Sequence, residues 1–270
     1  MDYDKEDDPD EWASKTEIDD EDRTLATRAF SLSCQGEHQL LTPYQVLRDA
    51  WNETRRNWEQ SPAHGELLET LATVRCPPNA DKIVCFGLGS LDGCDGYPTL
   101  DEMCDTDGLP LRTSMTQHCA ALTLAATLGA QIGKPPLKIL AQDPAYAPNQ
   151  VTLLAEEGIE VVPGIGALGF TYVDEDAIVF SCHPDVPVKQ IVADVAKPAG
   201  MIWDAVKPAD REATGWELRE AFGTHMICSP WCTDEDSVRT RALVAEYDKA
   251  DFPPDRQRFG RLEMYFRKEQ

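Results

Sequence analysis

Short apolar runs alternate with segments of helical periodicity between residues 82 and 204. The apolar runs are 82–88, 137–141, 159–163, 177–181 and 200–203. Helices are expected between them, near 114–130, 147–157 and 187–196. Strands that alternate with helices form a mostly parallel sheet with right-handed crossovers. The sequence therefore predicts a Rossmann-like α/β fold with helices on both faces of a mostly parallel sheet.

Further helices are expected on either side of this alternation. Residues 42–60 form an amphipathic segment that begins with Thr42 and Pro43. Its apolar face is predicted to contain Val46, Leu47, Ala50, Trp51 and Trp58. Other helices are predicted over 64–74, near 212–222 and near 234–248, with an apolar run at 224–228. Three regions follow: an acidic disordered tail (1–25), an N-terminal helical extension (26–80) and the Rossmann-like domain (81–270).

Composition limits the class of protein. A chain of 270 residues with 42% hydrophobic content can bury a full core. The net charge is -23, and residues 1–25 alone hold 12 acids against 3 bases, which is typical of a solvated tail. No apolar run approaches the roughly 20 residues that cross a bilayer, and the acidic start does not resemble a signal peptide. Nine cysteines without a CxxC pair favour reduced thiols. We expect a cytoplasmic protein with no membrane partner and no metal.

In the segment KIVCFGLGS, from Lys82 to Ser90, an apolar run typical of a buried strand is followed directly by glycines and a serine. Gly87 and Gly89 allow backbone angles or close approaches that a side chain forbids. Ser90 then lies at the carboxyl end of the strand, where open α/β sheets bind their ligands. Ser90 is therefore the first candidate functional residue.

A long acidic segment separates Ser90 from the next helix. Residues 91–113 greatly exceed the usual connection of about 2 to 6 residues. Six acids lie in it: Asp92, Asp95, Asp101, Glu102, Asp105 and Asp107. Such a loop is compatible with a solvated surface, with recognition of a cationic substrate or with a metal site, although the spacing fits no EF-hand.

Three other strand ends carry polar residues. Asp143 follows the run 137–141 and either caps the next helix or turn, or faces the same cleft as Ser90. His183 and Asp185 follow the run 177–181, and Asp204 follows 200–203. A histidine just past a strand is a candidate for acid–base work, although a lone histidine is more often structural.

Basic residues gather near the C-terminus and are interleaved with aromatic residues. They are Arg256, Arg258, Arg261, Arg267 and Lys268. The cluster is compatible with a patch for a phosphate backbone. A terminal strand with an exposed basic face explains the same pattern.

Five motifs in order resemble one known family. They are FGLGS, TQHCAALTLAATLGA, LAQDPAYAPNQVTLLAEEGIEVV, FSCHPD and MIWDAV. Over about residues 82–206 this set resembles the sensitivity-to-red-light-reduced-like domain, whose members show a Gly-Leu-Gly-Ser strand end, a glutamine-led helix and an Asp-Pro strand end. The chain has Cys-His-Pro where that family often shows Pro-His-Cys, and its acidic segment is longer. The resemblance implies a regulatory or ligand-binding domain.

The Gly87-Leu88-Gly89-Ser90 turn is also similar to that of cyclodipeptide synthases, which have a nucleophilic serine after the first strand. A fungal branch of that activity makes arginine-containing cyclic dipeptides. This second resemblance implies that Ser90 attacks arginyl-tRNA and that a second aminoacyl-tRNA reacts with the acyl-enzyme, whose dipeptide then cyclises.

That reading gives each candidate residue a role. His183 or Tyr146 relays protons, and the bases at 256–268 contact tRNA. Substrate-binding residues are expected at the strand ends and in the acidic segment, where carboxylates suit a guanidinium; they are Gly87, Gly89, Asp92, Asp95, Glu102, Gln117, Asp143 and Asp204.

Two alternatives remain open. The first is a non-catalytic domain whose strand-end residues bind a small ligand or only cap helices. The second is a nucleotide-binding transferase, but Gly87 to Asp92 lacks the third glycine of a dinucleotide fingerprint and no GxxxxGK occurs. We therefore expect neither NAD nor ATP, and no other cofactor.

Overall fold

A computed structural model describes residues 42–91, 112–163, 167–182, 184–209, 217–221, 224–228, 233–253 and 255–268. The chain divides into two units. One comprises Leu41–Glu212 and Asp234–Gln270 and holds the large sheet described below. The other comprises Met1–Leu40 and Ala213–Thr233, and is described only around two short strands.

The large sheet has, among the described residues, seven strands in the order β3-β2-β1-β4-β5-β9-β8. Five are parallel: β1 (Lys82–Phe86), β2 (Lys138–Gln142), β3 (Ile159–Val161), β4 (Ala177–Ser181) and β5 (Gly200–Asp204). The antiparallel strands are β9 (Leu262–Arg267) and β8 (Tyr247–Asp251). The mostly parallel sheet predicted from the alternation of apolar runs is confirmed.

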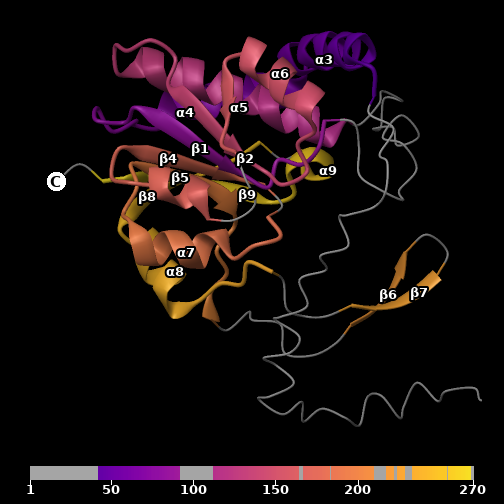
Figure 1. Ribbon diagram of the computed structural model, residues 1–270. Helices are drawn as coiled ribbons and strands as arrows, with labels where there is room; N and C mark the ends of the chain where they lie inside the picture. Colours follow the sequence, from indigo (N-terminus) through magenta and orange to yellow (C-terminus); the bar gives the residue numbers. More distant parts are fainter. Residues whose placement is uncertain are drawn as a thin grey trace, which may run out of the picture. The chain divides into compact units, whose positions relative to one another are not determined.

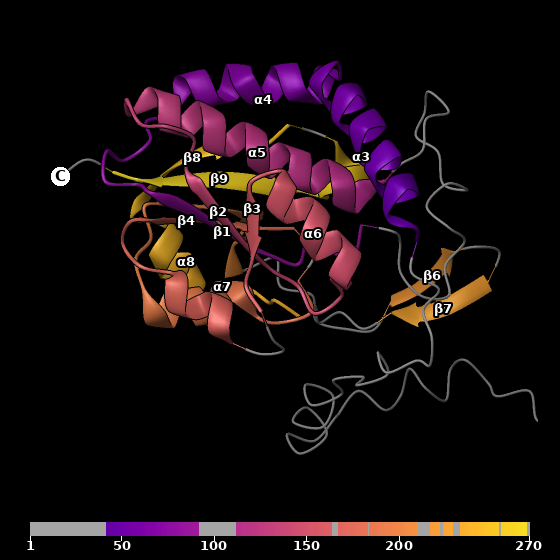
Figure 2. The same ribbon diagram turned by 45° about the horizontal axis from the view of Figure 1, so that its top comes forward.

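Helices cover both faces of this sheet (Figure 1). One face bears α3 (Tyr44–Glu59), α4 (Pro62–Thr73), α5 (Thr113–Gln131), α6 (Pro148–Glu156) and the short α9 (Arg256–Phe259). The other bears α7 (Val188–Val195), α8 (Val238–Val244) and the 3-10 helix η2 (Leu168–Tyr172). In Figure 2, α4 lies over α5 on the side away from the sheet, so the N-terminal helices add an outer layer. None of the described helices has the length and apolar character to cross a membrane.

The buried face of α3 differs from the predicted one, because Val46 is exposed, Ala50 is only half-buried and Thr54 is buried. Leu47, Trp51, Thr54 and Trp58 are buried, whereas Val46 is 56% exposed. The buried residues recur at helical spacing, and Val46 lies about 100° away from them around the helix axis. Thr54 satisfies its hydroxyl by donating to the Ala50 carbonyl at 2.8 Å, which lets a polar residue occupy the buried face.

The prediction of a helix near 212–222 is wrong. Strand β6 (Glu217–Ala221) pairs antiparallel with β7 (Thr224–Cys228) in a separate two-stranded sheet. Only Phe222 and Gly223 connect the strands, and a two-residue connection that contains glycine is typical of a β-hairpin. The helix predicted over 234–248 is shorter: α8 begins after a capping box of Ser237 and Thr240, and the chain then enters β8.

Candidate functional site at the carboxyl edge of the sheet

The five parallel strands end at one edge of the sheet, where strand order reverses between β1 and β4. The helix after β1, α5, lies on one face, and the helix after β4, α7, lies on the other. The connections therefore diverge at this point, and such a switch point is where open α/β sheets bind ligands. Ser90 follows β1 at this point, as predicted.

The turn between β1 and Ser90 requires glycine. Gly87 and Gly89 have φ angles of 66° and 76°, in the left-handed region that a side chain disfavours. The Gly89 N–H donates to Asp143 Oδ2 at 2.8 Å, and the Gly89 carbonyl accepts from Ser114 Oγ at 2.7 Å. Side chains from the loop after β2 and from the first turn of α5 thus hold this turn from two sides.

Ser90 is 7% exposed and contacts a buried amide on α6. Gln150 Nε2 donates to Ser90 Oγ at 2.9 Å, and Gln150 Oε1 accepts from the Leu91 N–H at 3.1 Å. Because the Leu91 N–H can only donate, it fixes the orientation of the Gln150 amide. Ser90 Oγ is consequently an acceptor toward Gln150, and its own proton is directed to a different acceptor.

A histidine and a tyrosine form a second part of the cluster. His118 is fully buried, and its Nδ1 lies 2.7 Å from the Ser114 carbonyl while its Nε2 lies 2.7 Å from the Tyr146 hydroxyl. Burial lowers the pKa of His118 to about 4, against the hydrogen bond to Ser114, which raises it. The ring is therefore neutral near pH 7, with its proton on Nδ1, and Tyr146 donates to Nε2. Burial also raises the pKa of Tyr146 well above its ordinary value.

Asp143 stabilises the loop after β2. Its Oδ1 accepts from the Ala145 N–H at 2.9 Å, and its Oδ2 accepts from Gly89. Burial raises the pKa of Asp143, and the two N–H donors lower it. The residue that caps α6 is Ala147, without a side-chain bond. Asp143 therefore caps a turn, one of the two structural roles considered for it, and in addition fixes the Gly89 turn.

The other predicted site residues are placed differently. The Gln117 side chain is buried and donates from Nε2 to the Arg258 carbonyl at 2.6 Å, which joins α5 to α9. Asp204 is exposed at the end of β5. Asp92, Asp95, Glu102 and His183 lie outside the described residues. The structure thus brings Gly87, Gly89, Ser90, Asp143 and Tyr146 together.

The C-terminal bases do not form one patch. Leu262 of β9 pairs with Asp204 and Phe266 pairs with Gly200, so β9 runs from the carboxyl edge of the parallel strands to their amino edge. Arg256, Arg258 and Arg261 precede β9 at the carboxyl edge, and Arg267 and Lys268 lie at the opposite edge, roughly 17 Å away at 3.4 Å per residue. Only the first three lie at the edge that holds Ser90.

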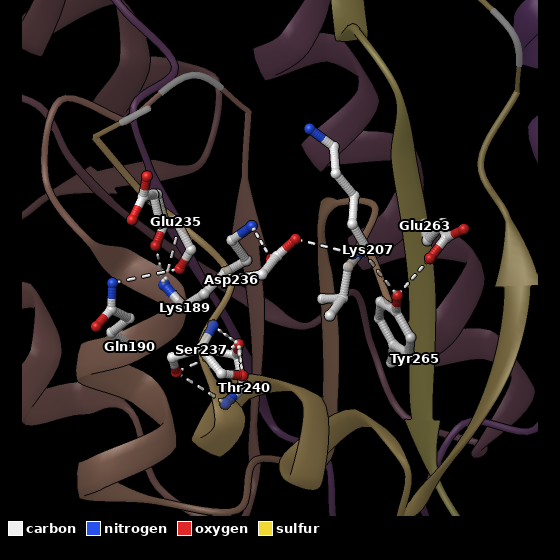
Figure 3. Close-up of polar contacts among 11 residues, drawn as sticks. Lys189, Gln190, Lys207, Glu235, Asp236, Ser237, Thr240, Glu263 and Tyr265 are labelled. Atoms are coloured by element: carbon white, nitrogen blue, oxygen red, sulfur yellow. Dashed lines mark hydrogen bonds and ion pairs between the residues drawn. The ribbon is translucent and has the colours of Figure 1, made fainter. Parts of the chain in front are cut away.

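A buried ion pair lies on the α7 side of the same edge (Figure 3). Lys189 Nζ lies 2.6 Å from Asp236 Oδ1, and both side chains are almost fully buried. Asp236 Oδ2 accepts from the Lys207 N–H at 2.8 Å, and the Asp234 carboxylate accepts from the Lys189 N–H. Burial is the main cause that raises the pKa of Asp234, to about 6. These contacts join α7, the segment after β5 and the residues before α8.

Cysteine nucleophiles are disfavoured among the described thiols. Burial raises the pKa of Cys76 to about 11 and that of Cys119 to about 12. Cys85 lies in β1, and Cys182 directly follows the neighbouring strand β4. Both are fully buried, and burial raises their pKa values above those of Cys76 and Cys119. Thiolates are the reactive form, so these residues are core side chains.

Sequence reasoning missed Ser114, His118 and Gln150. Ser114 and His118 lie one turn apart at the start of α5, within the glutamine-led helix, and Gln150 lies in the first turn of α6. Polar residues at helix starts that follow strand ends face the ligand edge. Their positions in the first turns of the two helices that follow β1 and β2 were the sequence signal that could have found them.

The sequence was compared with models of known protein families, and one model matches the region that contains the five motifs. The model described as the SRR1 domain matches residues 67–266. The match covers the large sheet, α5 to α9 and the Gly87–Ser90 turn. No curated protein and no solved structure matches the chain.

Proposed function

The chain belongs to the SRR1 domain family, and from that premise we propose that it is an aminoacyltransferase of the fungal arginine-containing cyclodipeptide synthase branch. Its substrates are arginyl-tRNA and a second aminoacyl-tRNA, and its product is a cyclic dipeptide. The observation that carries the proposal is the position of Ser90 at the switch point, with Oγ accepting from Gln150 at 2.9 Å on a glycine turn. As part of the proposal, the protein acts in the cytoplasm, where aminoacyl-tRNAs form.

The reaction has three steps. Ser90 Oγ attacks the ester carbon of arginyl-tRNA; a serine ester forms, and the tRNA oxygen leaves with the proton. The amino group of the arginyl-enzyme then attacks the ester of the second aminoacyl-tRNA, which releases that tRNA and leaves a dipeptide on Ser90. The remaining amino group attacks the Ser90 ester, closes the ring and returns the proton to Oγ. Activated esters react with a weakly activated nucleophile, which suits a serine held by an amide.

Tyr146 and His118 position the attacking amine in this mechanism. Tyr146 donates to His118 Nε2, so its oxygen lone pairs face outward from that bond and accept a hydrogen bond from the attacking amino group, whose proton leaves with the tRNA oxygen. His118, whose pKa is lowered to about 4 by burial, stays neutral and holds the Tyr146 hydroxyl in place. The pair connects to the nucleophile through Ser114, which bonds His118 by its carbonyl and Gly89 by its hydroxyl.

Charge at the carboxyl edge supports a cationic substrate. Asp143 and Asp204 lie at strand ends there, and Asp92, Asp95 and Glu102 follow Ser90 in sequence. A guanidinium is best held by carboxylates. Arg256 and Arg261 are exposed at the same edge, and we propose that they contact the phosphates of tRNA. The net charge of -23 opposes long-range attraction of tRNA, so contact residues must supply the affinity.

One observation favours a second candidate function, a non-catalytic ligand-binding domain. Ser90 is only 7% exposed, and Gln150, Asp143 and His118 are each engaged in hydrogen bonds inside the protein. Such a network also stabilises a fold without chemistry. The two candidates make opposite predictions for a product assay.

The assay expresses the full chain in a bacterial host and searches extracts by mass spectrometry for arginine-containing diketopiperazines. The wild type is expected to yield product, and Ser90→Ala is expected to abolish it. Thr152→Ala, which removes an exposed hydroxyl from the same helix as Gln150, is the matched control and retains it. Circular dichroism confirms that each variant folds. A folded wild type without product supports the ligand-binding domain, and product from Ser90→Ala removes Ser90 from the mechanism.

The acidic segment is tested by substrate competition. Asp92→Asn with Glu102→Gln is expected to lower the use of the arginyl substrate more than that of the second one, because only the first carries a guanidinium. An equal loss with both substrates contradicts this role.

A further inference from the structure

Arg112, at the start of α5, has a strained backbone. Its φ and ψ angles are 34° and 51°, and within the described part of the chain it is the only residue other than glycine with a positive φ. The left-handed region is sterically unfavourable for a residue with a Cβ. Such a conformation persists only where the surrounding structure enforces it, so the contacts of Arg112 must hold this backbone.

The helix that follows Arg112 does not explain the conformation. Arg112 is the N-cap of α5, yet its side chain makes no capping hydrogen bond. Favoured N-cap residues have short polar side chains and an extended backbone, and Arg112 has neither. Its carbonyl accepts from the N–H and the hydroxyl of Thr116, at 3.0 Å and 3.1 Å. The helix therefore begins here without a side-chain cap.

The guanidinium of Arg112 binds helix α3, which packs against α5 (Figure 2). Nη1 donates to the Ala50 carbonyl at 3.1 Å and lies 2.7 Å from Glu53 Oε2. It also lies 3.5 Å from Thr54 Oγ1, and that hydroxyl is 3.6 Å from Met115 Sδ in the first turn of α5. The Arg112 side chain is mostly buried by these contacts, at 15% exposure. Helix α3 thus holds the residue from which α5 begins.

The first turn of α5 holds, in its turn, the glycine segment before Ser90. Ser114, two residues after Arg112, donates from Oγ to the Gly89 carbonyl at 2.7 Å. The carbonyl of Ser114 also lies 2.7 Å from His118 Nδ1. A displacement of this helical turn would therefore move the hydrogen-bond partner of Gly89, which directly precedes Ser90.

We propose that Arg112 is a positioning residue for Ser90. Its guanidinium, bound to α3, holds the left-handed backbone at the start of α5, and this backbone places the Ser114 hydroxyl on the Gly89 carbonyl. Helix α3 precedes residues 67–266, which match the SRR1 domain, so this support comes from outside the matched region. The proposal concerns the geometry of the turn and does not require that Ser90 act as a nucleophile.

The test measures amide hydrogen exchange in the full chain, resolved by residue in nitrogen-15 NMR spectra. The Gly89 N–H donates to Asp143 and the Leu91 N–H donates to Gln150, so the two amides report opening of the turn around Ser90. Arg112→Ala is expected to accelerate their exchange about three- to tenfold, as the loss of one hydrogen bond does.

A double-variant cycle tests whether Arg112 acts through Ser114. Ser114→Ala removes the hydroxyl that binds Gly89, and is itself expected to accelerate exchange at the turn. In the Ser114→Ala background, adding Arg112→Ala should change the exchange by less than about twofold, because the contact that Arg112 positions is already absent. A residue that only stabilises the fold would accelerate exchange by the same factor in both backgrounds.

Three further variants separate the side chain of Arg112 from its backbone. Glu53→Gln keeps an oxygen but removes the charge of the ion pair, and is expected to accelerate exchange at the turn about two- to threefold. Glu59→Gln makes the same change in an exposed ion pair with Arg55 on the same helix, and should have no effect there. Arg112→Gly adopts the left-handed region freely, so its exchange should fall between those of the wild type and Arg112→Ala.

Four results overturn the proposal. The first is unchanged exchange of Gly89 and Leu91 in Arg112→Ala. The second is an equal acceleration by Arg112→Ala with and without Ser114→Ala. The third is an equal response to Glu53→Gln and Glu59→Gln, and the fourth is faster exchange in Arg112→Gly than in Arg112→Ala.

The product assay adds a separate measurement. Arg112→Ala is expected to lower the yield of cyclic dipeptide in the wild-type background. A wild type that forms no product contradicts the proposed acyl transfer alone, because the exchange measurements of Gly89 and Leu91 do not depend on it.

Discussion

The hydroxyl of Tyr146 donates to Nε2 of His118, and the two atoms are 2.7 Å apart. This bond exists because the other ring nitrogen of His118 is committed to the Ser114 carbonyl, which leaves Nε2 as the acceptor. The pair joins the loop after β2 to the first turns of α5. It also makes the stability of the fold depend on pH.

His118 predicts a loss of stability in acid. Its pKa in the folded protein is about 4, below the ordinary value of 6.5, so the unfolded chain binds a proton more readily between these values. Its contribution is fully present above pH 6.5 and is lost as the pH falls toward 4, by about 3 kcal/mol in all. Urea unfolding of wild type and His118→Gln over this range measures it. The wild type should lose more stability than the variant; parallel curves would falsify the buried neutral histidine.

For Asp234 we expect the opposite dependence of stability on pH, over nearly the same pH range. Its pKa in the folded protein is about 6, above the ordinary 3.8, so the folded chain binds the proton more readily. Stability therefore falls as the pH rises from about 4 to about 6. Asp234→Asn, which retains an oxygen for the Lys189 N–H, should remove this fall. In the double variant with His118→Gln both slopes should disappear, and a residual difference from additivity would indicate that the two groups interact.

The buried ion pair Lys189–Asp236 predicts a large single-variant cost. Lys189→Met leaves the Asp236 carboxylate buried without its cation, and is expected to lower the free energy of unfolding by about 3–5 kcal/mol. Adding Asp236→Leu should restore part of this loss. The exposed pair Lys197–Glu246, also at 2.6 Å, is the matched control, and Lys197→Ala should cost at most about 1 kcal/mol. Equal costs for the two lysines would contradict the importance of burial.

Replacement by alanine is expected to have opposite effects on stability at two glycines, Gly129 and Gly65. A Cβ at Gly129 would lie 2.4 Å from the Pro135 carbonyl oxygen, so Gly129→Ala is expected to cost about 1–3 kcal/mol through overpacking. Gly65 lies in α4, and a Cβ added there would have no neighbouring atom within 4 Å. Gly65→Ala should therefore stabilise the protein by up to about 1 kcal/mol. Thermal unfolding of the two variants checks both signs; destabilisation by Gly65→Ala is the result that would contradict the packing argument for this pair.

The strand ends and helix faces could be predicted because they depend on local pattern. The apolar run before Gly87 is strand β1, and the Asp-Pro pair directly follows strand β2. Because these strands are parallel, both strand ends lie at the carboxyl edge of the sheet, as expected. The helix predicted near 212–222 failed because a two-residue connection made a hairpin there. The prediction that Val46 is buried was wrong, because consecutive residues of a helix point about 100° apart and Val46 lies outside the buried face.

The sequence by itself determined a mostly parallel α/β sheet, its two layers of helices and the place of Ser90 at the ligand edge, since hydrophobic period and glycine chemistry act over a few residues. Only the tertiary structure decided the partners: Gln150 for Ser90, His118 for Tyr146 and Asp143 for Gly89. It also divided the C-terminal bases, because β9 runs antiparallel to its neighbour. Hydrogen-bond partners depend on the register and crossover of segments distant in the chain, and no local pattern specifies these.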